Sequence, residues 1–248
     1  MNTTEDFESI EFNQIIQRIQ SGDADPRVVA FVQKIPKEYL PPTDLESPQA
    51  RILDATRKLF AEKGFEGAST REIAERAGVN QAMIHYYFGN KKELYKRIIV
   101  QKIYTLFLMI ASMMPLTITP RQFISEFPVR MIENLRSRPQ FRQIMLREVA
   151  GGGATLQEIV NELGENGPRG FRKLMFSVFE QGKAEGTIQD LPLDTMMYFL
   201  LGFSYSAMFV ESFFSIVAGI DFTDEEQWKI HRNALKKIMM HGLMTEEK

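Results

Sequence analysis

Between residues 81 and 91 the chain carries side chains that could recognise a nucleic acid. A Gln can bond adenine through both groups of its amide, an Ala methyl can pack on the thymine methyl, and Tyr, His and Lys can bond phosphates. If residues 81–88 are helical, Ile84 and Phe88 point inward. The outward residues are then Gln81, Ala82, His85 and Tyr86. This spacing indicates a helix that buries one side and reads DNA with the other.

Two short helices joined by a tight turn would position these side chains. We expect Thr70 to cap the first helix, Gly78 to end it with a positive φ, and Asn80 to cap the second helix. A helix, a short turn with Gly and a second helix form the helix-turn-helix pattern, whose second helix lies in the DNA major groove. From spacing alone, a helical hairpin that only packs is the alternative.

The charge distribution favours DNA binding by this part of the chain. Residues 1–47 hold 4 basic and 9 acidic side chains (net −5), residues 48–97 hold 10 and 6 (net +4), and residues 98–248 hold 16 and 17 (net −1). The only positive section therefore contains the helix-turn-helix pattern. Such a section is expected of a DNA-binding head, because affinity depends largely on displacing counterions from phosphate.

The sequence gives little support for an enzyme or for a metal site. The chain has no Cys and three His (His85, His231 and His241), without the spacing of a zinc or di-iron site. The Gly run at residues 151–153 lacks the strand and the Lys-Ser/Thr pair of a phosphate-binding loop. We therefore expect no catalytic residues, metal or cofactor. An enzyme or a helical interaction protein stays a minor alternative.

Residues 1–47 form an acidic N-terminal extension and linker. Phe12, Ile15, Ile16 and Ile19 make one short apolar stripe, residues 28–35 make a second, and Pro36, Pro41, Pro42 and Pro48 follow. The segment is either a flexible arm, or it docks on the protein's own body or on a partner subunit. Because the segment is acidic, we do not expect it to bind in the DNA minor groove. It lacks the basic start and apolar core of a signal peptide, and together with the missing Cys this predicts a cytoplasmic protein.

Helical periodicity continues along the rest of the chain. The expected helices are residues 49–63, 92–113, 120–137, 139–149, 154–163, 169–185, 192–219 and 223–242, and Pro128 should kink or split the third of these. The fold class is therefore all-α. The long helix at 92–113 would link the phosphate-binding candidate Lys91 rigidly to the apolar interior.

Residues 192–219 are the most apolar segment. Glu211 is the only charge between Met196 and Ile220, which is long enough for a membrane span. Gly, Ser and Tyr dilute the segment and no basic cluster flanks it, so we expect no membrane insertion. One stripe could face the core: Met196, Leu200, Phe203, Ala207, Val210 and Phe214. Met197, Leu201, Ser204 and Met208 could face a second subunit.

Residues 50–94 resemble the DNA-binding head of the TetR family of transcriptional regulators. The resemblance rests on motifs spread over nearly the whole segment, about a fifth of the chain. They are Leu59–Gly64, Ala68-Ser69-Thr70, Ile73-Ala74, Ala77-Gly78-Val79, Tyr87-Phe88 and Asn90-Lys91 with Leu94.

The resemblance implies roles for individual residues. Thr70 and Arg71 would hold phosphate or a base at the start of the second helix of the head, and Gln81, Ala82 and Met83 would read bases. His85 stands where a phosphate-binding Tyr is usual, which makes that contact doubtful or pH-sensitive. Tyr86, Tyr87 and Lys91 would contact the DNA backbone.

The resemblance also implies an architecture. Residues 48–95 would be a three-helix DNA-binding head, and residues 96–248 a helical ligand-binding and dimerisation domain. A homodimer would bind double-stranded DNA at a palindromic operator, usually as a repressor, and a small apolar or amphipathic ligand would release it. The candidate pocket residues are Phe107, Phe127, Met131, Met175, Phe179 and Phe203. The candidate interface residues are Met197, Leu201, Met208, Trp228 and Leu235. Control by a protein partner through the N-terminal extension is the alternative.

Overall fold

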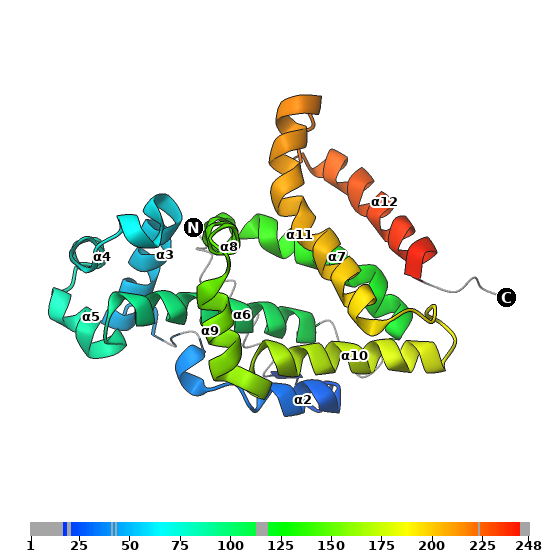
Figure 1. The fold of residues 1–248 in the computed structure, drawn as a ribbon, viewed down its shortest axis with the longest axis horizontal. Helices are drawn as coiled ribbons and strands as arrows, with labels where there is room; N and C mark the ends of the chain where they lie inside the picture. The colour runs from blue at the N-terminus through cyan, green and yellow to red at the C-terminus, as the bar shows by residue number, and fades with distance from the viewer. Residues whose placement is uncertain are drawn as a thin grey trace.

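The computed structural model describes residues 17–18, 21–40, 42, 44–112, 119–222 and 224–243, and every regular element in them is helical (Figure 1). The fold is all-α. The elements are α2 (Pro26–Val32), η1 (Lys37–Tyr39), α3 (Pro48–Gly67), α4 (Thr70–Ala77), α5 (Gln81–Phe88), α6 (Lys91–Ser112), α7 (Pro120–Ser137), α8 (Pro139–Ala150), α9 (Ala154–Leu163), η2 (Gly164–Asn166), α10 (Pro168–Ala184), α11 (Leu193–Ala218) and α12 (Glu225–Leu243).

Helix α6 links the two parts of the fold and packs against α3, α5, α7 and α9. It begins beside α5, and in Figure 1 α7 and α8 lie above it while α10 and α2 lie below it. Twenty-two residues at 1.5 Å each give a rod of about 33 Å. Its apolar side chains are buried from Leu94 to Ile110, so both ends lie in one continuous core. The long helix expected at residues 92–113 is confirmed from its start to Ser112, and residue 113 lies outside the described residues.

The head consists of α3, α4, α5 and the first turns of α6. Its centre is apolar and fully buried, with Ile52, Phe60, Ile73, Ile84 and Leu94. Helix α3 breaks at Gly64, where φ is 73° and ψ is 178°, a conformation open to Gly because it has no Cβ. The helix end expected at Gly64 is thereby confirmed as a break.

Arg147 of α8 forms hydrogen bonds to the head at this break in α3. Its guanidinium donates to the carbonyls of Phe60 (2.9 Å) and Glu62 (3.2 Å), in the last turn before Gly64. Carbonyls at a helix end have no partner within the helix, so a cation that donates to them is favourable. The sequence pattern did not single out Arg147, because its partners are backbone atoms some 85 residues away.

The body is built from α7–α12 around the far half of α6. Helices α11 and α12 both pack on α7 and project away from α10 (Figure 1). Of the two effects expected of Pro128, the split is wrong, since α7 runs through this proline as one helix, and the kink stays a prediction. Among the described residues, no helix combines the length and hydrophobicity that crossing a bilayer requires.

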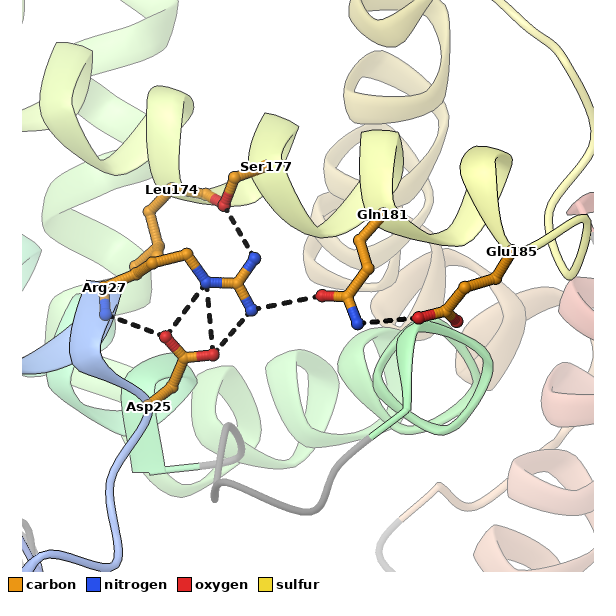
Figure 2. A network of polar contacts seen from close by, with 6 residues as sticks. All are labelled: Asp25, Arg27, Leu174, Ser177, Gln181 and Glu185. Carbon is orange, nitrogen blue, oxygen red and sulfur yellow. Dashed lines mark hydrogen bonds and ion pairs between the residues drawn. The ribbon is translucent and has the colours of Figure 1, made fainter.

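Residues 25–40, which we call the strap, lie against α10 and α6. Asp25 caps α2 and holds the Arg27 guanidinium at 2.5–3.1 Å, and Arg27 in turn donates to Ser177 (3.2 Å) and Gln181 (3.4 Å) of α10 (Figure 2). The hydrogen bond from Arg27 holds the pKa of Asp25 below its usual value, against the effect of burial. The second apolar run of the extension therefore docks on the protein's own body, as one interpretation of the sequence expected. The first stripe lies outside the described residues.

Phe31 anchors the strap in the core. Only 6% of its surface is exposed, and its ring meets Phe107 and Phe171 edge-on at centroid distances of 5.7 and 6.2 Å. Those two rings stack on each other at 4.1 Å. Phe31 thus completes an aromatic cluster shared by the strap, α6 and α10.

We predict that Phe31→Ala lowers the free energy of unfolding by about 3 kcal/mol, because it leaves a cavity against two buried rings. Gln33→Ala, an exposed change two residues away, should alter stability little. Denaturant unfolding gives both values, and hydrogen exchange should show faster exchange in residues 26–40 of Phe31→Ala. Equal stability of the two variants would mean that the strap does not contribute to the core.

Candidate nucleic-acid interface

The start of α4 is fixed by a reciprocal cap. Ser69, not Thr70, is the N-cap: its hydroxyl accepts from the Glu72 backbone N–H (3.2 Å), and the Glu72 carboxylate accepts from the Ser69 N–H (2.9 Å). The N-cap that we expected at Thr70 therefore lies one residue earlier in the chain, at Ser69. Two adjacent hydroxyl residues could both cap, and Ser69 has Glu72 three residues further on, which completes the capping box.

The turn between α4 and α5 has the expected construction. Gly78 adopts φ 63° and ψ 39°, and its N–H reaches back to α4 carbonyls. The Asn80 side chain accepts from the Ala82 N–H at 2.9 Å and so caps α5. Ile84 and Phe88 are buried beneath α5. Helix α5 is thereby held with its opposite side outward.

The outward side of α5 carries the predicted base-reading residues. Gln81, Ala82, His85 and Tyr86 are exposed, with Tyr86 82% exposed, whereas Met83 and Tyr87 are half-buried. The Gln81 amide nitrogen donates to the Thr70 hydroxyl at 2.9 Å, which joins the starts of α4 and α5. An amide nitrogen has two hydrogens, so Gln81 keeps a donor and an acceptor for a base while Thr70 orients it.

His85 has a defined ring orientation. Its Nδ1 lies 2.8 Å from the Gly89 carbonyl oxygen, which can only accept, so Nδ1 carries a proton. The neutral ring then offers Nε2 only as an acceptor. It can donate to a phosphate from Nε2 only when the imidazole is doubly protonated.

Lys91 joins the start of α6 to the start of α4. Its ammonium donates to the Ala68 carbonyl (2.9 Å) and lies 4.3 Å from the centre of the Phe65 ring. Ala68 directly precedes the cap of α4. Because an ammonium has three donors, this contact leaves hydrogens for a phosphate.

The cations of the head are largely paired with carboxylates. Arg71 contacts Glu75 (3.0 Å), Arg76 contacts Glu62 (2.8 Å) and Lys63 contacts Glu72 (2.6 Å). The hydrogen bond from Lys63 is the main cause that lowers the pKa of Glu72 to about 2. Such exposed pairs are individually weak, so their cations can turn to a phosphate at small cost.

The predicted pocket residues separate into two groups. Phe107, Phe127, Met131, Met175 and Phe179 are buried in the main core. Phe203 instead lines a cavity between α7, α11 and α12.

The predicted interface residues also separate. Trp228 and Leu235 line the same cavity as Phe203, while Met197 and Leu201 pack partly against the main core. The side chain of Met208 is outside the described part. The described residues contain no group of three or more His, Asp or Glu that could hold a metal ion.

Comparison with known proteins places the head in a family. Residues 52–98 match the family described as "Bacterial regulatory proteins, tetR family". The HTH-type transcriptional repressor NicS of Pseudomonas putida is 26% identical over 151 residues, which are 60% of this chain and 70% of NicS. The HTH-type regulator YttP of Bacillus subtilis is 43% identical over 53 residues, which are 21% of this chain and only 26% of YttP.

The likeness in three dimensions extends beyond the head. The crystal structure of a TetR family transcription regulator from Shewanella sp. PV-4 superposes with a TM-score of 0.61 at 19% identity. The superposition covers 81% of this chain and 100% of that one, so the helical body has the same fold as well. The family match therefore assigns the head, residues 52–98, to the TetR family of regulatory proteins, and the rest of the chain shares the fold of a TetR family regulator.

Proposed function

We propose that this chain is a repressor that binds a palindromic operator as a homodimer and leaves it when a small apolar or amphipathic ligand binds the helical body. The observation that carries the DNA-binding part is the outward face of α5, where Gln81 is oriented by Thr70 and flanked by exposed His85 and Tyr86. The names of NicS and other relatives, which are repressors, support the direction of control.

A large exposed apolar surface on α11 and α12 supports the dimer. Its residues are Tyr198, Phe199, Val210, Phe213, Phe214, Ile216 and Val217 on α11, and Ile230, Ile238 and Met240 on α12. Surfaces of this kind mark sites of association. In a dimer each subunit supplies one α5, and the distance between the two sets the spacing of the operator half-sites.

The packing of the strap favours ligand control over the partner alternative. Val28, Phe31, Val32 and Ile35 are buried against the protein's own helices. A partner that captured this segment would first have to expose those side chains.

Selection from a genomic DNA library at two salt concentrations tests the proposal. A palindrome recovered at both concentrations is the expected result. Retention that vanishes at the higher salt and carries no motif would mean that the head is only an electrostatic contact.

Gln81→Ala should relax the preference at one base position in each half-site by about 1–3 kcal/mol, because a bidentate contact is lost. Gln157→Ala, an exposed Gln on α9, is the control and should bind like the original protein. Binding to an operator library read by sequencing measures the preference. If Gln81→Ala keeps the original preference at every position, Gln81 does not read a base.

Phe213→Glu combined with Ile216→Glu should convert the dimer to monomers, because both side chains are exposed in the subunit and a charge is costly at an apolar interface. Light scattering after size exclusion measures the mass, and circular dichroism checks that the helices remain. A folded double variant with the dimer mass would place the interface on another surface.

A further inference from the structure

Glu211 is the single charge in the apolar stretch of α11, and it faces a cavity. The cavity has a volume of about 200 Å³ and lies where α7, α11 and α12 meet. Aromatic rings dominate its wall: Phe203 from α11, Phe222 from the loop before α12, and Trp228 and His231 from α12. Leu235 adds an aliphatic side.

The size and the lining of the cavity favour one aromatic ring. A protein cavity of about 150 Å³ lined by apolar side chains accommodates benzene, so about 200 Å³ allows one ring with a small substituent. Aromatic walls offer edge and face contacts to such a ring. The wall is also braced, because the Arg136 guanidinium lies 4.3 Å from the centre of the Trp228 ring.

Glu211 supplies the polar group of the cavity. Its side chain is 13% exposed, and its carboxylate oxygens lie 3.8 Å from Arg136 Nε and 3.9 Å from Arg142 Nη1. Both separations exceed hydrogen-bond distance, so the two cations balance the charge while the oxygens keep acceptor positions. Burial raises the pKa of Glu211, which the two arginines oppose.

We propose that this cavity binds a single-ring aromatic molecule with a hydrogen-bond donor, such as a phenol, whose ring lies among Phe203, Phe222 and Trp228 and whose O–H donates to Glu211. An anion would meet the Glu211 carboxylate. A cation would be repelled by the two arginines that already flank that carboxylate. This site is separate from the aromatic core around Phe107, and its occupation can be measured without DNA.

The only tryptophan of the chain stands in the cavity wall and reports its occupation. Titration of the full-length protein with 4-methylphenol should give a saturable change in tryptophan fluorescence. Toluene, which lacks only the hydroxyl, should bind about tenfold more weakly, as expected for a hydrogen bond to a charged group. Benzoate and benzylammonium, which test the two charged classes, should bind more weakly than 4-methylphenol.

Substitutions test separately how the space of the cavity and how its polar group contribute to ligand binding. Glu211→Leu should abolish the preference for 4-methylphenol over toluene, and Glu211→Gln, which keeps a carbonyl acceptor, should retain part of it. Leu235→Phe should fill the space and block both ligands. Glu133→Leu is the matched control, because it removes a carboxylate that pairs with Arg232 outside the cavity, and it should leave both affinities unchanged.

Three results would overturn the proposal: no saturable fluorescence change in a folded protein, equal affinities for 4-methylphenol and toluene, or tightest binding by benzylammonium or benzoate. Unchanged binding by both Glu211→Leu and Leu235→Phe would likewise show that the ligand lies elsewhere. Circular dichroism of each variant shows whether a variant that no longer binds is still folded. Glu211→Gln tests the role of the charge while the side chain keeps its volume.

Discussion

The burial of α6 from Leu94 to Ile110 is the constraint on which the structure depends. One helix cannot bend sharply without breaking its hydrogen-bond ladder, so the head at its start and the body around its end are held by the same rod. Lys91 at the first position of α6 also bonds the residue before the cap of α4. A displacement of α6 along its axis would therefore be transmitted directly to the start of α4.

A second connection between body and head lies on α8. Arg147 bonds the carbonyls beside the break in α3, and the neighbouring Glu148 accepts from Tyr95 of α6 (3.0 Å) and from the N–H of Thr155 at the start of α9 (2.7 Å). Adjacent residues of α8 thus contact three helices: α3, α6 and α9. Because α3 and the start of α6 belong to the head, α8 connects the body to the head by a second route beside the length of α6.

The helices were predictable from the sequence because their signals are local. Apolar periodicity gave their lengths, and Gly78 and Asn80 marked the turn that the structure contains. The cap at Ser69 was missed by one residue, since Ser69 and Thr70 have the same chemistry and only backbone geometry distinguishes them. Arg147 and the grouping of Phe203, Trp228 and Leu235 could not be predicted, because each depends on how distant helices pack.

The strap adds a constraint of its own on the proposed response to a ligand. At one end Arg27 and Phe31 hold it to α10, and at the other Tyr39 lies 4.8 Å from the Arg97 guanidinium of α6 and lines a small cavity with Tyr87 and Phe88 of α5. The strap therefore contacts α10 and α6, and it lines one cavity together with α5. A ligand that separated α10 from α6 would have to move Phe31 out of its cluster with Phe107 and Phe171 or carry the strap along. In the second case the strap would carry the displacement to Arg97 of α6 and to the cavity that it lines with α5.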